Sequence, residues 1–167
     1  MSQEEENRVG QYARRVGEIL ELEQETLEML ELAGSLHDVG KEMISEHIIE
    51  KPGPLTDAEW EAIRKHPELG EAYARGEGHP QDVGDWVRHH HERLDGTGYP
   101  DHLEGEDIPM GARIIAVLDA YVGMTSPRPY RPPIPAQVAL DELEHAAGKH
   151  FDPQVVDIFV RLVRANL

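Results

Sequence analysis

The chain has 167 residues, of which 39% are hydrophobic and none is cysteine, so it can bury the core of one domain but offers neither disulfides nor thiolate metal ligands. Its formal net charge of −17 argues against binding to nucleic acid or to an anionic membrane, because phosphate groups attract basic surfaces. It contains neither an apolar run of about 18 residues nor a signal-type leader, so we expect a cytoplasmic protein with one domain over residues 1–167, whether or not it was cut from a longer regulatory protein.

The first part of the chain is expected to form two helices. Apolar residues from Val9 to Val16 repeat at i, i+3, i+4 and i+7, which is typical of a helix that faces a core. A second helix is expected from about residue 24. Its apolar face begins at Leu27 and includes His37, which would point inward, and Gly40 would end or loosen this helix.

The middle of the chain is expected to form two further helices. Residues 56–59 read as a capping box that opens a helix carrying Trp60 and His66, and Pro67 is expected to break or kink it. The next helix starts near Val83 and delivers two histidines at 90 and 91.

The last part begins with loops over 95–100 and 103–109 and then returns to helix near residue 112. This helix places Asp119 on an otherwise apolar face. A buried carboxylate is costly without a partner, so Asp119 should be ligating, paired or protonated. Two more helices are expected, one over 136–147 and one after Asp152.

Two motifs suggest a two-metal centre. LHDVGK at 36–41 contains a His-Asp pair, and HHHERLDGTGYP at 89–100 contains a His-His pair. Neighbours on a helix point about 100° apart, so the members of a pair reach two adjacent ions more easily than they chelate one. With nitrogen and oxygen ligands only, such a centre fits hydrolysis of a phosphate ester by a metal-activated water better than redox or structural duty.

The combination resembles the HD-GYP subfamily of the HD-domain metallophosphohydrolases, bacterial phosphodiesterases that cleave cyclic di-GMP. The resemblance runs through most of the chain, over LHDVGK at 36–41, EKPGPLT at 50–56, KHPELG at 65–70, HHERLDGTGYP at 90–100, ARIIAVLDAY at 112–121, TSPRPYR at 125–131 and HFDPQVV at 150–156. It implies an all-α HD-domain bundle of about six or seven helices with the metal centre inside.

The resemblance also implies the metal ligands. Asp38 would bridge two ions, and the other ligands would be His37, His66, His90, His91 and Asp119. Mixed imidazole and carboxylate donors suit several divalent transition metals; we expect Fe or Mn and leave open two or three ions. His89 lies outside the ligand register and is expected to face solvent.

Three positions depart from the family pattern. Glu5 stands where a metal-binding His is usual; it can still donate oxygen ligands, so it is kept as an additional candidate ligand. Val122 replaces an acid three residues after Asp119, and Pro127 replaces another acid.

Four residues are expected to act on substrate. Lys41 would stabilise charge that develops on phosphate oxygens. Arg128 and Arg131 match positions that hold phosphate or guanine in the family, and planar guanidinium groups suit both tasks. Tyr99 is held by the Gly-Tyr-Pro turn and would position substrate or a second loop.

The resulting hypothesis is a metal-dependent phosphodiesterase that opens cyclic di-GMP to pGpG, and on to GMP in one version, through a hydroxide shared by two metal ions. The alternative is a module with weak or no hydrolysis that binds the nucleotide or a partner protein as a signalling output. A third option keeps the chemistry but changes the substrate to another cyclic dinucleotide or a nucleotide monoester. Whether the chain forms a homodimer or binds a signalling protein is left open.

Overall fold

The computed structural model describes residues 3–127 and 132–166, and over these residues the chain is helical, with no strand beyond two isolated bridges. The elements are α1 (Gln3–Ile19), α2 (Gln24–Leu36), η1 (Val39–Met43), α3 (Glu46–Ile49), α4 (Asp57–Ile63), α5 (His66–Gly76), α6 (Gln81–His89), η2 (Gly105–Asp107), α7 (Met110–Thr125), α8 (Ala136–Ala146) and α9 (Pro153–Arg164), where η marks 3-10 helices. Within the described ranges, seven α-helices have nine residues or more. The expected all-α bundle is therefore confirmed.

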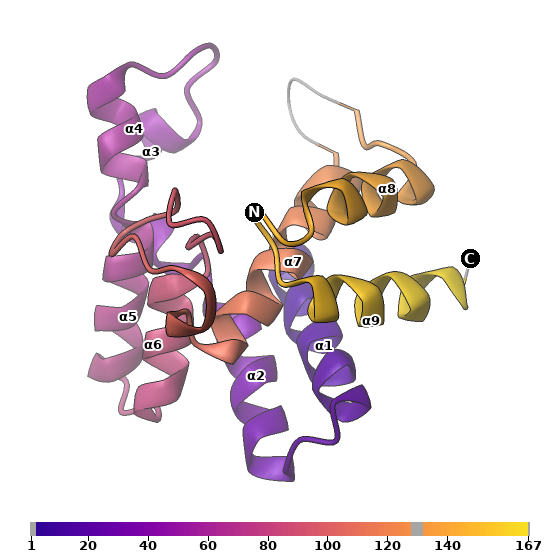
Figure 1. The fold of residues 1–167 in the computed structure, drawn as a ribbon. Helices are drawn as coiled ribbons and strands as arrows, with labels where there is room; N and C mark the ends of the chain where they lie inside the picture. Colours follow the sequence, from indigo (N-terminus) through magenta and orange to yellow (C-terminus); the bar gives the residue numbers. More distant parts are fainter. Residues whose placement is uncertain (1–2, 128–131, 167) are drawn as a thin grey trace.

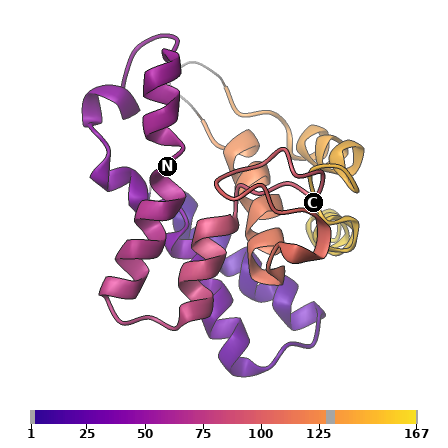
Figure 2. The ribbon, with the colours of Figure 1, turned by 60° about the vertical axis from the view of Figure 1, so that its left-hand side comes forward.

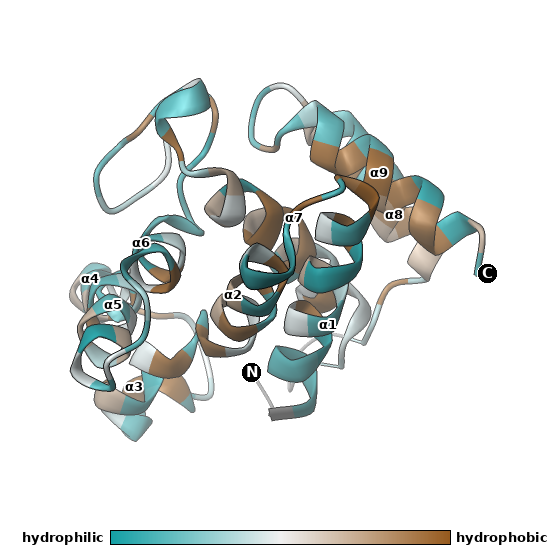
Figure 3. Ribbon diagram, turned by 90° about the horizontal axis from the view of Figure 1, so that it is seen from below, coloured by the Kyte–Doolittle hydropathy of each residue, from teal (hydrophilic) through white to brown (hydrophobic). Residues whose placement is uncertain are grey.

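Helix α7 occupies the centre of the molecule (Figure 1). It contacts α1 and α2, which form one hairpin, α6, which pairs with α5, and the C-terminal helices α8 and α9. Most of its length is apolar, as the brown ribbon in Figure 3 shows, and Ile114, Ile115 and Leu118 are fully buried. Seen from a second direction, α8 and α9 lie side by side on one flank, while α5 and α6 lie on another (Figure 2).

Local signals place several helix ends. Thr56 and Glu59 form the expected capping box, and Asp152 caps α9 by accepting hydrogen bonds from the backbone nitrogens of Gln154 and Val155. Asp152 also accepts a 2.6 Å hydrogen bond from Arg113, which ties the start of α9 to α7. Among the described helices, none combines the length and apolar content needed to cross a bilayer.

Two helix ends differ from expectation. The single helix expected to carry both Trp60 and His66 is instead two helices, because α4 stops at Ile63 and α5 begins at His66. Pro67 lies in the first turn of α5, where its missing N–H costs nothing, so it opens a helix rather than kinking one. The second helix of the chain also ends early, at Leu36, before the His-Asp pair.

Candidate metal centre

The His-Asp pair lies where α2 gives way to η1. His37 is the residue that follows the last turn of α2, and Asp38 precedes the 3-10 turn. Gly40 allows this turn to approach α5, because a Cβ at Gly40 would overlap the carbonyl oxygen of His66. The close approach brings Asp38 Oδ1 to 3.3 Å from Nε2 of His66.

The six predicted ligands converge from four parts of the chain. One potential ligand atom from each of Asp38, His66, His90 and His91 lies within 4.8 Å of the others. His37 lies on the other side of Asp38, with its Nε2 3.7 Å from Asp38 Oδ2 and 3.5 Å from Asp119 Oδ1. The two oxygens of Asp38 thus face different histidines, as a carboxylate that bridges two ions would.

Three of the histidines share one orienting contact. In His37, His66 and His90 the Nδ1 atom donates a hydrogen bond to the carbonyl oxygen three residues earlier, because a carbonyl can only accept. The distances are 2.7 Å to Gly34, 2.7 Å to Ile63 and 2.6 Å to Val87. With the proton on Nδ1, the neutral form of each ring turns the lone pair of Nε2 toward the centre of the cluster.

These inward-facing atoms lack hydrogen-bond partners. Among the described residues, Nε2 of His37, His66 and His90 and Oδ1 of Asp38 are buried and form no hydrogen bond. Each buried polar atom without a hydrogen bond costs about 1–3 kcal/mol of folding free energy, so these four atoms together would cost several kcal/mol. Imidazole nitrogen and carboxylate oxygen are ligands of divalent transition metals, so the donor set and its unsatisfied atoms fit such ions.

The electrostatics keep most of the nitrogen donors unprotonated. Burial lowers the pKa of His66 to about 4, helped by the charge of Lys41, and burial also lowers the pKa of His91 to about 4. The pKa of His90 falls well below its usual value through burial and the adjacent histidines. A neutral imidazole is the form that binds a metal ion.

His37 behaves differently. Burial disfavours its charged form, but Asp38 and Asp119 outweigh burial and raise its pKa to about 9. Although burial alone would raise them, the pKa values of both carboxyl groups are lowered by this histidine. His37 must therefore release a proton when it binds a metal ion.

Two cavities flank the cluster. One, of about 400 Å³, is lined by Asp38 and Lys41 together with acidic and apolar side chains: Glu6, Glu42, Ile44, Glu46, Ile49 and Glu50. Lys41 Nζ lies 2.7 Å from Asp38 Oδ2. The other cavity, of about 580 Å³, is lined by His91 and Tyr99 and by four basic side chains, Arg64, Lys65, Arg93 and His102, with Glu61 and Glu68 also in its wall.

Sequence reasoning missed the basic cavity and Glu6. Arg64 and Lys65 directly precede the candidate ligand His66 in the sequence, and this proximity could have indicated basic side chains near the metal centre. Glu6 lines the cavity beside Asp38, and burial raises its pKa, whereas its neighbour Glu5 was the predicted ligand. Glu5 is 9% exposed in α1, and its role as a ligand stays a prediction.

The remaining predictions have mixed outcomes. The expectation that His89 faces solvent was wrong, because its side chain is only 14% exposed. Its Nε2 lies 2.9 Å from Asp101, and its Nδ1 donates to the carbonyl of Asp85. Val122 is fully buried in the core. Arg128 and Arg131 lie outside the described residues, so their roles stay predictions.

Comparison with known proteins identifies the family. A family model described as "HD domain" matches residues 1–155. The chain is 40% identical over 156 residues to the cyclic di-GMP phosphodiesterase response regulator RpfG of Xanthomonas campestris pv. campestris, covering 92% of this chain and 41% of that protein. It is 36% identical over 155 residues to the 3'3'-cGAMP-specific phosphodiesterase 2 of Vibrio cholerae, covering 92% of this chain and 30% of that protein.

A solved structure supports the same assignment of the fold. The crystal structure of the V. cholerae cyclic GMP-AMP specific phosphodiesterase V-cGAP3 matches with a TM-score of 0.75 at 20% identity, over 96% of this chain and 44% of that one. The chain thus spans less than half the length of each of these proteins. The resemblance to HD-GYP proteins is confirmed, and the chain belongs to the HD-domain family.

Proposed function

We propose that this chain is one domain, over residues 1–167, that hydrolyses a cyclic dinucleotide with the help of divalent metal ions, Fe or Mn. We propose two such ions and leave open whether a third one binds. The observation that carries the proposal is the set of buried nitrogen and oxygen atoms that face one another without hydrogen-bond partners, on Asp38 and three histidines. When bound, divalent ions in such a set lower the pKa of water and so supply a nucleophile near neutral pH.

The protein's own residues have distinct tasks in this reaction. Asp38 presents Oδ1 to His66 and Oδ2 to His37, so it lies between the donors on the two sides of the cluster. Lys41 holds its ammonium group against Asp38 in a cavity wall, close enough to the cluster to stabilise negative charge that grows on a phosphate oxygen. The hydrogen bonds of His37, His66 and His90 to the carbonyl three residues earlier fix these three rings before substrate arrives.

The charge distribution supports an anionic substrate despite the net charge of −17. A cyclic dinucleotide carries two phosphodiester charges, which the acidic surface repels at long range. The larger cavity beside His91 gathers Arg64, Lys65 and Arg93, which outnumber its two acidic residues, Glu61 and Glu68. Its lining is therefore net positive and favours anions locally. Substrate would therefore be held mainly by this basic wall, and Arg128 and Arg131 are proposed to add contacts.

We take cyclic di-GMP as the substrate and pGpG as the first product, with GMP as the end product if a second hydrolysis follows. RpfG is named for cyclic di-GMP, whereas the Vibrio relative is named for 3'3'-cGAMP, so both nucleotides belong in the test.

The test is incubation with each nucleotide in the presence of Mn(II) or of Fe(II) without oxygen, followed by chromatography of the products. Cyclic di-GMP should disappear as pGpG appears, and an Asp38→Asn variant should leave it intact. Asp141→Asn, at an exposed carboxylate of α8, is the matched control and should react like the parent protein. Binding of nucleotide without turnover by the metal-loaded protein would contradict the proposal and favour an output module.

A further inference from the structure

We infer that Arg88, Glu92 and Asp101 are positioning residues for the candidate metal ligand His91, and that they act through the ring of Tyr99. The inference rests on the proposed metal site. The ring of His91 packs on Tyr99, whereas the other histidines of the cluster are oriented by hydrogen bonds to carbonyl groups. An ion-pair network outside the cluster holds the loop that carries Tyr99.

His91 lacks the orienting hydrogen bond of the other histidines. Among the described residues, no carbonyl accepts a bond from its ring, whereas His37, His66 and His90 each have one. Instead, the ring of His91 stacks on Tyr99, with the ring centroids 5.0 Å apart and the planes inclined by 26°. The ring also contacts His90, at a centroid distance of 4.0 Å, and His66, at 5.0 Å, both of them candidate ligands. Tyr99 packs on His91 from outside the ligand set, so the orientation of His91 depends in part on where the loop places Tyr99.

The loop of Tyr99 lies directly on the turn that carries the His-His pair. The backbone nitrogen of Tyr99 donates a 3.2 Å hydrogen bond to the carbonyl oxygen of His91. Gly98 leaves no room for a side chain, because an added Cβ would come within 2.6 Å of that same carbonyl oxygen. A small displacement of this loop would consequently move the Tyr99 ring relative to His91.

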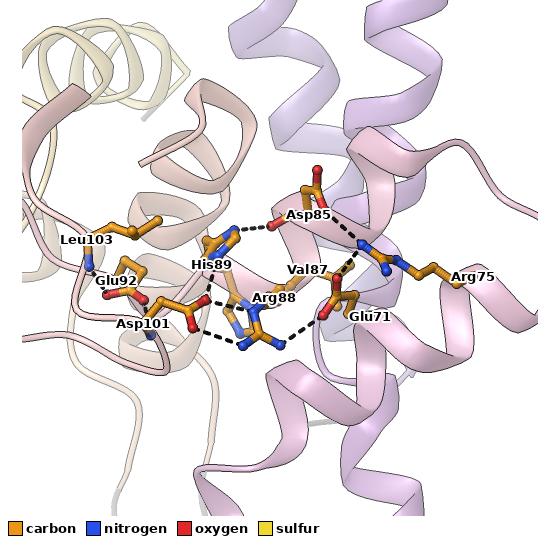
Figure 4. Close-up of polar contacts among 10 residues, drawn as sticks. Glu71, Arg75, Asp85, Val87, Arg88, His89, Glu92, Asp101 and Leu103 are labelled. Atoms are coloured by element: carbon orange, nitrogen blue, oxygen red, sulfur yellow. Dashed lines mark hydrogen bonds and ion pairs between the residues drawn. The ribbon is translucent and has the colours of Figure 1, made fainter. Parts of the chain in front are cut away.

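An ion-pair network fixes the far end of the loop (Figure 4). Arg88 donates two hydrogen bonds to the carboxylate of Asp101, from Nε at 2.7 Å and from Nη2 at 2.9 Å. Its third nitrogen donates to Glu71 of α5 at 2.9 Å, and His89 Nε2 lies 2.9 Å from Asp101. Such a bidentate pair fixes direction as well as distance.

Glu92 adds a second attachment from beneath the loop. Its side chain is 3% exposed and accepts hydrogen bonds from the backbone nitrogens of Asp101, at 2.7 Å, and Leu103, at 3.2 Å. Arg88 and Glu92 thus bracket the two candidate ligands in sequence, and both reach the residues that follow Pro100. The same five-residue segment supplies ligands and anchors the loop that orients one of them.

The contribution to metal affinity of a group that orients a ligand can be estimated. Loss of such a partner typically weakens metal affinity by about 10- to 100-fold. We therefore expect Asp101→Ala and Tyr99→Leu each to weaken Co(II) or Mn(II) binding by about tenfold or more. If the network acts through Tyr99, the double variant should be little worse than either single variant, because the two changes break one chain of contacts.

The experiment measures Co(II) affinity by calorimetry and the visible absorption spectrum of the Co(II)-loaded protein, which reports ligand geometry. Tyr99→Phe keeps the ring and should retain both affinity and spectrum. Asp101→Asn keeps the shape of the side chain but removes its charge, so it replaces Asp101→Ala in the test if the alanine variant fails to fold. Glu144→Ala is the matched control, because it removes another carboxylate that accepts two hydrogen bonds from an arginine, Arg164, on α8 and away from the site. Melting temperatures with excess chelator measure the purely structural cost of each change.

Affinity loss in Asp101→Ala and Tyr99→Leu, with a changed spectrum and with Glu144→Ala unaffected, would support the inference. Unchanged metal affinity in Tyr99→Leu, or additive losses in the double variant, would overturn it, as would a parent protein that binds no metal. Because metal binding is measured without substrate, the inference can hold if no cyclic dinucleotide is cleaved and can fail in an active enzyme.

Discussion

Asp38 has two roles in the proposed site, since one of its carboxylate oxygens faces His66 and the other faces His37. Its charge also lowers the cost of burying a protonated His37 beside it, and it pairs with the half-buried Lys41. An amide of the same shape would keep the packing but lose the charge and half of the oxygen donors. The residue can therefore be tested without creating a cavity.

Asp38→Asn should reduce bound metal and lower the rate of hydrolysis by more than about 100-fold, since even groups that only orient a ligand are worth about 10- to 100-fold. Elemental analysis of protein purified without chelator gives the metal content, and product chromatography gives the rate. A variant that retains more than one equivalent of metal and full turnover would mean that Asp38 does not bridge the ions.

Lys41 and Arg128 are expected to affect different kinetic constants. Lys41 touches the cluster through Asp38 and should act on charge that grows in the transition state, so Lys41→Ala should lower kcat by roughly 100-fold. Arg128 belongs to the proline-rich segment predicted to hold substrate before reaction, so Arg128→Ala should mainly raise KM. Steady-state kinetics with cyclic di-GMP decide between them, and the reverse pattern would refute this division of roles.

At the scale of elements, the approach of η1 to α5 makes the site possible. Gly40 has no room for a methyl group, since a Cβ there would overlap the His66 carbonyl and lie 2.7 Å from the backbone nitrogen of Gly70. Both contacts are with backbone, which cannot rotate away as a side chain can. Any larger residue must therefore push Asp38 away from His66.

Gly40→Ala should destabilise the protein by about 1–3 kcal/mol, as overpacking of a core commonly does, and should weaken metal binding as well. Gly76→Ala is the control, because that glycine ends α5 with open space around it and alanine favours helix by up to about 1 kcal/mol. Urea unfolding of both variants gives the comparison. Equal stabilities would show that η1 can move away from α5 at little cost.

The sequence predicted most of these elements because their signals are local. Apolar spacing, the capping box at Thr56 and the turn residues each act within a few positions of the chain. The motifs themselves predicted the His37-Asp38 and His90-His91 pairs, whereas the full set of six candidate ligands was implied by the family resemblance. Their convergence was implied by the family resemblance, since no local pattern says that α5 and α7 approach the same point.

Sequence reasoning failed where the deciding contact is distant in the sequence, and where neighbouring residues on a helix face different surroundings. His89 looked like a solvent-facing residue, but its partner Asp101 lies twelve residues away in a loop that folds back over α6. Glu6, which sequence reasoning missed, lies one step from Glu5 on the helix, or about 100°, and its carboxylate lines the cavity at Asp38. The role of Glu5 as a ligand stays a prediction. Pro67 could equally kink a helix or open one, and only the packing of α5 against η1 chooses.

For the whole molecule, the site creates two opposing dependences of stability on pH in the metal-free protein. Burial lowers the pKa values of His66 and His91 to about 4 in the folded protein, from an ordinary value of 6.5. Between pH 6.5 and 4 the unfolded chain therefore binds more protons at these residues, so stability falls as the pH falls. His37, with a pKa of about 9, binds its proton more tightly when folded, so its contribution is lost as the pH rises from 6.5 through 9.

Chelator-treated protein should consequently be most stable near pH 6.5 and lose stability in both directions, as urea midpoints between pH 5 and pH 9 would show. His66→Gln should flatten the acid side of this profile, whereas His145→Gln, at an exposed histidine of α8, should leave it unchanged. Saturating metal should remove the loss above pH 6.5, because His37 has already released its proton on binding. A metal-loaded protein that loses stability toward pH 9 as steeply as the metal-free one would argue that His37 is not a ligand.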